Sequence, residues 1–172
     1  YFLVTHYLLD LLRLGELKRI INVSSLAHKL VLKIDWENIQ AEKSYGQLYN
    51  YGLSKLFNIY FTKSLAQHLK AEGFLVNCLH PGTVNTGFGS SAKGFYKRLV
   101  SAINQFLISP NKGAATSVFL ASSEEAKDIN GEYLFRKKIA KTSTLAKNEA
   151  YVSKLWELSM QLGKLEEYGV VD

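Results

Sequence analysis

Tyr51 and Lys55 stand four residues apart in the first half of the chain. On an α-helix, residues with this spacing lie on one face, about one turn apart. A phenol has an ordinary pKa of about 10, so it exchanges a proton readily near neutral pH only when a nearby cation stabilises the phenolate. Lys55 is such a cation, and Ser25 can offer a hydroxyl to a carbonyl oxygen. The three groups are suited to moving a proton on and off an alcohol oxygen, which is the chemistry of a carbonyl/alcohol oxidoreductase.

The tyrosine–lysine spacing is weak evidence for a catalytic pair by itself. The chain contains 10 tyrosines, and such pairs arise by chance or as surface contacts. The elements around the pair strengthen it. A β-branched, apolar run over residues 19–23 predicts a buried strand that is closed by Ser24 and Ser25. Apolar residues at helical spacing predict a long helix over residues 47–70, which would carry the tyrosine and the lysine.

The rest of the pattern alternates short apolar strands with helices. A second strand ends at His80 and Pro81, where the chain must turn because proline cannot donate to a strand ladder. Residues 26–45 lack periodicity and predict a long loop, which in a compact domain is usually functional. This alternation predicts an α/β fold with a parallel sheet and helices on both faces. Helices are expected over residues 2–14, 47–70, 93–107, 111–122 and 146–162, and strands over residues 19–23, 74–79 and 131–135.

Composition favours one globular domain, because 47% of the 172 residues are apolar. Cys78 is the only cysteine, so we expect a core residue and a reducing, intracellular compartment. The apolar run over residues 1–14 is interrupted by polar residues and is too short to span a membrane. Because the chain begins at Tyr1 and its only methionine is Met160, we expect a fragment of a longer protein or a processed chain.

The net charge of +6 is concentrated near the C-terminus, where six basic residues between residues 136 and 154 accompany only Glu149. A solvated helix face and loop are the favoured interpretation. Contact with an anionic membrane surface is the second interpretation. Nucleic acid is the least favoured partner, because no binding motif accompanies the charge.

Three motifs occur in an order that resembles the C-terminal two-thirds of a short-chain dehydrogenase/reductase. They are INVSS at residues 21–25, YGLSK at residues 51–55 and NCLHPGTVNT at residues 77–86. Within that family the chain is similar to the retinol dehydrogenases, on VSSLAH at residues 23–28 and on a serine-to-tyrosine gap roughly twice that of many members. The resemblance implies a Rossmann-like, doubly wound parallel sheet.

The resemblance also implies roles for single residues. Ser25 would polarise the substrate oxygen, Tyr51 would be the acid/base, and Lys55 would lower the tyrosine pKa and hold the nicotinamide ribose. Ser24 is the neighbouring hydroxyl, and the family pattern favours the second serine of the pair.

The turn after the second strand would lie against the nicotinamide. Pro81, Gly82 and the backbone of Val84 would form this contact, and the hydroxyl of Thr86 would reach the carboxamide. Residues 93–107 would then cover the substrate, and lids of this kind often gate turnover.

By the same resemblance, residues 1–172 form one partial NAD(P)-binding domain whose first strands and glycine-rich phosphate loop would precede Tyr1. The residue that selects the cofactor would precede it too, so NADP is the favoured cofactor and NAD stays open. The piece alone should bind a dinucleotide poorly. Without a sheet neighbour, the strand over residues 19–23 would expose an apolar edge, so we expect aggregation of the isolated piece.

The leading hypothesis is an NADP-preferring oxidoreductase in lipid metabolism that interconverts an apolar alcohol and its aldehyde or ketone, such as retinol and retinal. The alternatives are a short-chain dehydrogenase for steroids or other lipid carbonyls, and a truncated non-catalytic paralogue that serves as a binding or scaffold protein. The expected partner is the small apolar alcohol or aldehyde substrate, and nucleic acid is not expected to bind. Association with the endoplasmic reticulum membrane in the full-length protein and the oligomeric state stay open.

Other motifs carry less weight. Residues 87–92 match a dinucleotide fingerprint, but no acidic residue follows at the spacing that a ribose contact needs, so a loop is favoured. The four histidines lack metal-ligand spacing, and no metal site is expected. Asn22 begins a formal glycosylation signal within an expected buried strand, which argues against its use.

Overall fold

The computed structural model of the chain describes residues 1–82 and 108–170. The predicted strands and helices within these residues are present, with ends that differ by a few residues, and the helix expected over residues 93–107 lies outside them. The main elements are α1 (Phe2–Arg13), β1 (Arg19–Val23), α2 (Gln47–His68), β2 (Leu75–His80), α4 (Pro110–Ser122), β3 (Tyr133–Phe135), β4 (Lys138–Ile139) and α5 (Glu149–Gly163). Short 3₁₀ helices are η1 (Leu26–Leu30), η2 (Trp36–Asn38), η3 (Lys70–Glu72), η4 (Glu124–Ala126) and η5 (Leu145–Lys147).

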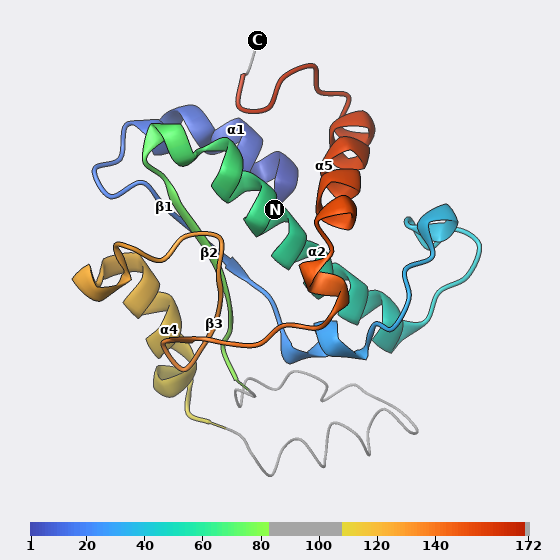
Figure 1. The fold of residues 1–172 in the computed structure, drawn as a ribbon, viewed down its shortest axis with the longest axis horizontal. Coiled ribbons are helices and arrows are strands. Elements are labelled where there is room, and N and C mark those ends of the chain that lie inside the picture. The colour runs from blue at the N-terminus through green and yellow to red at the C-terminus, as the bar shows by residue number, and fades with distance from the viewer. Residues whose placement is uncertain (83–107, 171–172) are drawn as a thin grey trace.

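The strands form one sheet in the order β1-β2-β3-β4. β1 pairs with β2 and β2 pairs with β3, both in parallel, and Val23 lies opposite Leu79. Helices α1, α2 and α5 lie on one side of the sheet and α4 on the other (Figure 1). The predicted α/β fold with a parallel sheet is therefore confirmed.

A short antiparallel strand, β4, follows β3 and was not expected from the sequence. The turn between them contains Arg136 and Lys137, whose φ angles are 50° and 63°. Glycine and asparagine adopt such angles most readily, so a turn made of two basic residues gives no hairpin signal in the sequence.

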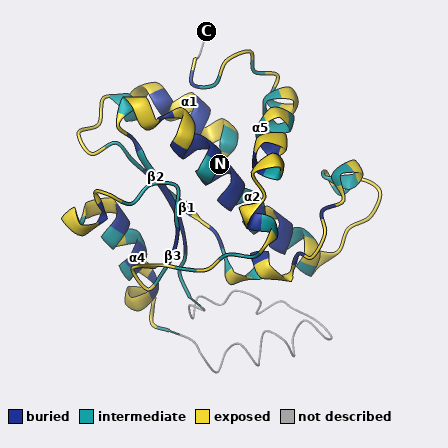
Figure 2. Cartoon of the chain, viewed as in Figure 1, coloured by how far each residue is buried: buried dark blue, intermediate teal, exposed yellow. Residues whose placement is uncertain are grey.

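The core consists of layers on both faces of the sheet, because strand side chains alternate between them. Val76 and Cys78 of β2 pack beneath α2, whereas Leu79 packs with α4. Buried residues run along most of α2 and along β2 (Figure 2). Cys78 is buried as expected, and burial raises the pKa of its thiol to about 12.

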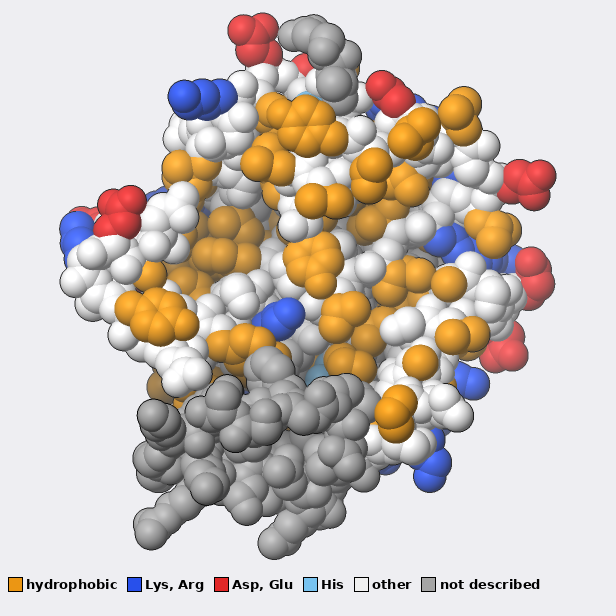
Figure 3. Space-filling view, turned by 180° about the vertical axis from the view of Figure 1, so that it is seen from behind, with side chains coloured by type: hydrophobic (Ala, Val, Ile, Leu, Met, Phe, Trp, Pro, Cys, Tyr) orange, Lys and Arg blue, Asp and Glu red, His pale blue; other side chains and the backbone are white. Residues whose placement is uncertain are grey.

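The chain after α5 returns to α1 (Figure 1). The Tyr168 hydroxyl donates to the Phe2 carbonyl oxygen at 2.9 Å, and the backbone N–H of Gly169 donates to Nδ1 of the buried His6 at 2.9 Å. The opposite side of α1 exposes an apolar row, and many hydrophobic side chains also lie on the surface seen from behind (Figure 3). The row consists of Leu3, Val4, Tyr7, Leu8, Leu11 and Leu14. Within residues 1–82 and 108–170, every helix is too short or too polar to cross a bilayer.

Candidate active site

The two serines after β1 have different surroundings. Ser24 is 2% exposed, and its hydroxyl donates to the carbonyl oxygen of Lys55 at 2.7 Å. Ser25 is half-buried, and its Oγ accepts the backbone N–H of Ala27 at 3.2 Å. A hydroxyl that accepts one hydrogen bond still has a proton to donate. Ser25 can therefore offer that proton to a substrate oxygen, whereas Ser24 already uses its own proton.

Tyr51 and Lys55 share one face of α2, as their spacing predicts. Nζ of Lys55 lies 5.6 Å from the centroid of the Tyr51 ring and donates to the carbonyl oxygen of Val23 at 3.4 Å. Burial lowers the pKa of the Lys55 ammonium from its ordinary value. The cation is thus held between the end of β1 and the tyrosine, where it can stabilise a phenolate.

A glycine sets the distance between this helix and the serine segment. A Cβ atom on Gly52 would lie 2.8 Å from the carbonyl oxygen of Ala27 and 3.1 Å from a Val31 methyl group. Only a residue without a side chain lets α2 approach η1 this closely. Because Gly52 directly follows Tyr51, the close approach occurs beside the candidate acid/base.

Asn58 also acts at this junction, although the sequence did not single it out. Its Nδ2 donates to the Val23 carbonyl oxygen at 3.0 Å, so the end of β1 is tied to two positions on α2, one turn apart. The spacing of Lys55 and Asn58 could have suggested a shared face, but nothing in the sequence indicates their common acceptor. Asn22 is buried with its amide bonded to Thr62, which agrees with discounting it as a glycosylation site.

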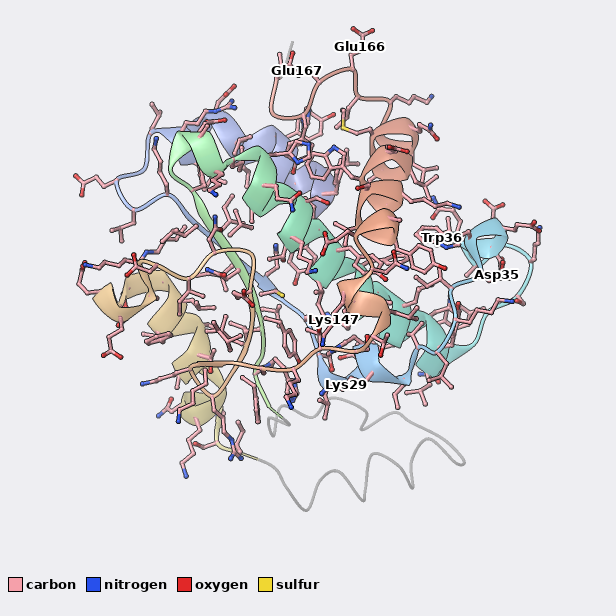
Figure 4. The ribbon with its side chains drawn as sticks, in the orientation of Figure 1. Lys29, Asp35, Trp36, Lys147, Glu166 and Glu167 are labelled. Carbon is pink, nitrogen blue, oxygen red and sulfur yellow. The ribbon has the colours of Figure 1, made fainter. Side chains whose placement is uncertain are left out.

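Residues 26–45, called the insertion because they lie between the serine and the tyrosine, are anchored rather than loose. They were expected as a loop, and they contain η1 and η2. Trp36 of η2 lies between this segment and α5 (Figure 4), where it packs against Tyr151 at 5.4 Å between ring centroids and stacks on Phe57 at 6.2 Å. Nζ of Lys154 lies 4.7 Å from the centroid of the Trp36 ring. These contacts fix the insertion against the same helix that carries Tyr51.

The turn after β2 lies beside the end of β1, since Val23 pairs with Leu79. Gly82 has a φ angle of +90°, and a Cβ atom there would meet the Ile108 side chain at 2.7 Å. His80 stacks on Phe135 with ring centroids 5.1 Å apart. Pro81 and Gly82 thus follow β2 at the same edge of the sheet where Ser25 follows β1. The predicted contacts of Val84 and Thr86 lie outside the described residues.

His80 is a neutral histidine in this environment. Burial, followed by the nearby His28 and Lys29, lowers its pKa to about 4. Its Nδ1 is buried and has no hydrogen-bond partner in the described structure. Residues 1–82 and 108–170 contain no cluster of three or more metal-ligating side chains.

A parallel sheet with helices on both faces defines the class of Rossmann-like proteins, and ligands of this class bind at the carboxyl ends of the strands, where Ser25 and Lys55 lie. A family model described as enoyl-(acyl carrier protein) reductase matches residues 1–136. Human retinol dehydrogenase 11 is 37% identical over 162 residues, which cover 94% of this chain and 50% of that protein. Human retinol dehydrogenase 14 is 36% identical over 162 residues, which cover 92% of this chain and 48% of that protein.

A crystal structure of an uncharacterized protein from Mycobacterium paratuberculosis superposes with a TM-score of 0.62 at 26% identity, over 86% of this chain and 51% of that one. The chain therefore belongs to the short-chain dehydrogenase/reductase family, and the two human relatives to which it is similar are retinol dehydrogenases. It spans about half the length of the curated relatives that it matches.

Proposed function

We propose that this chain carries the proton-transfer site of an NAD(P)-dependent oxidoreductase that interconverts an apolar alcohol and its aldehyde or ketone. The observation that carries the proposal is the position of Lys55, whose Nζ lies 5.6 Å from the Tyr51 ring centroid and is hydrogen bonded to the end of β1. This arrangement brings the cation, the phenol and the Ser25 segment to one edge of the sheet.

Each side chain has a distinct role in the proposed reaction. In carbonyl reduction, the Tyr51 hydroxyl donates its proton to the substrate oxygen, and in alcohol oxidation the phenolate takes the proton back. The positive charge of Lys55 stabilises the phenolate in both directions. Ser25 donates a hydrogen bond to the same oxygen, so the charge that develops there is stabilised. When bound, the nicotinamide cofactor supplies or accepts the hydride.

The described residues fit such a cofactor at the carboxyl ends of β1 and β2, where ligands of open α/β sheets bind. Lys55 has three N–H donors, and among the described residues it donates to Val23. It can therefore also hold a ribose hydroxyl. Gly82 has a positive φ and carries no side chain that could obstruct the approach of a ligand to its backbone. Preference for NADP over NAD is part of the proposal.

Retinol or retinal is the proposed substrate type, because the curated relatives are named retinol dehydrogenases and are 37% and 36% identical to this chain. The apolar row on α1 and the basic C-terminal segment are consistent with working at a membrane surface, which is where such a substrate dissolves. The proposal includes an intracellular location for the protein.

The test is an assay of the complete polypeptide as its gene encodes it, with NADPH or NADH and with retinal or a panel of steroid ketones. We expect NADPH-dependent reduction of retinal. Absence of turnover with both cofactors and all carbonyl substrates would sink the proposed function. If a steroid ketone were turned over faster than retinal, the proposed substrate would be wrong, but the proposed type of reaction would stand.

Substitution of the acid/base gives the sharpest mutational test. Tyr51→Phe should lower kcat by about 100- to 10,000-fold, because the proton donor is lost, while cofactor binding measured by fluorescence is retained. Tyr49→Phe is the matched control: Tyr49 lies on the same helix, and its hydroxyl bonds to the insertion at Lys33 and Asp35. Equal activity of the two variants would contradict the role of Tyr51.

A further inference from the structure

His28 is a buried histidine three residues after the candidate catalytic serine. Its side chain is 0% exposed. Nδ1 lies 2.6 Å from the carbonyl oxygen of Ser25, and Nε2 lies 3.2 Å from the backbone nitrogen of Ser143. One imidazole thus joins the serine segment to a part of the chain that lies 115 positions further on.

The two partners determine the tautomer. A carbonyl oxygen can only accept, so Nδ1 must carry the proton, and a backbone N–H can only donate, so Nε2 must be unprotonated. A second proton on Nε2 would point at the N–H of Ser143 and break that bond. The geometry therefore requires a neutral imidazole with its proton on Nδ1.

The surroundings agree with a neutral ring. Tyr133 of β3 packs edge-on against the ring with centroids 5.0 Å apart. The charged neighbour that affects the pKa of His28 is Lys29 on η1, which is labelled in Figure 4, and His28 in turn affects the pKa of His80. Burial is the first cause that lowers the pKa of His28, and the positive charge of Lys29 acts in the same direction.

The bond to Ser25 holds the carbonyl side of that residue, whereas its nitrogen side follows Ser24, whose backbone N–H donates to the Leu79 carbonyl oxygen at 2.7 Å. η1 is a single short turn with Leu26 and Leu30 exposed, and the Ser25 side chain itself caps the turn through Ala27. The carbonyl of Ser25 also accepts the backbone N–H of His28 at 3.3 Å, a longer contact than the 2.6 Å bond from the ring. The imidazole therefore fixes the peptide plane from which the serine hydroxyl projects.

We propose that His28 is a positioning residue of the oxidoreductase: as a neutral imidazole it clamps the backbone of Ser25 to the segment at Ser143, and so aims the serine hydroxyl at the oxygen that Tyr51 protonates. This role rests on the proposed function. It assigns His28 no contact with the substrate or the cofactor.

Two substitutions separate the bonds. In His28→Asn, the amide nitrogen occupies the place of Nδ1 and can still donate to Ser25, but the bond from Ser143 is lost. In His28→Gln, the amide oxygen reaches the place of Nε2 and can accept from Ser143, but the bond to Ser25 is lost. His28→Phe fills the space and loses both bonds.

On the complete polypeptide, we expect His28→Asn to stay within a few-fold of the wild-type kcat. His28→Gln and His28→Phe should lose about 100-fold, the size of effect that a misplaced catalytic group produces, with little change in KM. Thermal unfolding of each variant shows how much folded enzyme is present. Equal kcat for the Asn and Gln variants at equal folded fraction would overturn the positioning role.

A spectroscopic measurement makes failure of this inference distinguishable from failure of the proposed function. Imidazole ¹⁵N chemical shifts of His28 in the complete polypeptide should show the Nδ1–H tautomer and keep it as the pH falls past the ordinary histidine pKa. This readout does not require turnover. An Nε2–H tautomer, or an imidazolium at neutral pH, would overturn the inference even if the enzyme were active, whereas an inactive wild type with the expected shifts would refute only the proposed function.

Discussion

The carboxyl ends of β1 and β2 lie side by side, yet they are held in different ways. At the end of β1, the Val23 carbonyl oxygen accepts from Lys55 and Asn58, and the next residue, Ser24, donates to the backbone of α2. Directional hydrogen bonds therefore fix this end to the helix that carries Tyr51.

At the end of β2, beyond its backbone pairing with β1 and β3, the side chains pack by shape. His80 is held by stacking on Phe135 and has a buried nitrogen without a partner in the described structure. Pro81 has no N–H to donate, and Gly82 fits against Ile108 because it lacks a side chain. In the proposed function, the first end keeps the proton-transferring groups in place, whereas the second presents backbone to the cofactor.

Substitutions of Ser24 and Ser25 test how the end of β1 is held, and they should give the largest effect on kcat. Ser25→Ala should lower kcat by about 100-fold because a hydrogen-bond donor to the substrate oxygen is lost, with only about 1 kcal/mol of stability lost with the cap. Ser24→Ala should do the reverse: its buried hydroxyl is worth about 1 to 2 kcal/mol of unfolding free energy, with a smaller change in kcat. Denaturant unfolding and initial rates on the complete polypeptide measure both. The opposite pattern would exchange the roles of the two serines.

The glycine pair compares the two ends directly. Gly52→Ala should cost about 2 kcal/mol of unfolding free energy, because the added methyl meets the backbone carbonyl of Ala27, which cannot turn aside. Gly82→Ala should cost only about 1 kcal/mol of unfolding free energy. The loss comes from the positive φ angle, which alanine adopts poorly, whereas the Ile108 side chain can rotate away from the added methyl group. Urea unfolding of both variants provides the measurement. A smaller loss for Gly52→Ala than for Gly82→Ala would show that α2 and η1 are not closely packed.

The smallest effect concerns pH at the end of β2. The pKa of His80 is about 4 in the folded chain and 6.5 ordinarily, so between these values the unfolded state binds more protons. By linkage, the stability is complete above pH 6.5 and falls as the pH decreases towards 4. Since the ring is only half-buried, we expect a loss of about 1 kcal/mol.

The variant His80→Gln provides the control for this pH effect. His28, whose pKa is also lowered, is present in both proteins and contributes in the same direction. Chemical unfolding at several pH values should therefore show a shallower loss of stability in the variant. Identical profiles would mean that His80 is not held neutral by the fold.

Local patterns predicted much of this architecture. The bounds of β1 were predicted correctly, because a β-branched run closed by polar residues is a local signal. The helical spacing of apolar residues likewise placed Tyr51 and Lys55 on one face of α2. The choice of Ser25 over Ser24 stays a prediction, and the hydrogen bonds of the two hydroxyls are consistent with it.

What the sequence did not reveal depends on distant partners or on unusual backbone angles. The partner of His28 at Ser143 is 115 positions away, so no local pattern could show that this histidine is bonded at both nitrogens. The turn at Arg136 and Lys137 lacks the glycine or asparagine that usually marks a hairpin, which concealed β4.

The contact between α1 and the C-terminal segment also affects how the chain reaches this structure. The bonds from Tyr168 to Phe2 and from Gly169 to His6 join positions 166 and 163 residues apart. Contacts between such distant positions close slowly, because the chain entropy of the loop must be lost first. On the ribosome, α1 therefore emerges long before its last partners are made. Its packing is completed only after residues 168 and 169 have been synthesised, so its apolar side chains stay exposed to other chains until then.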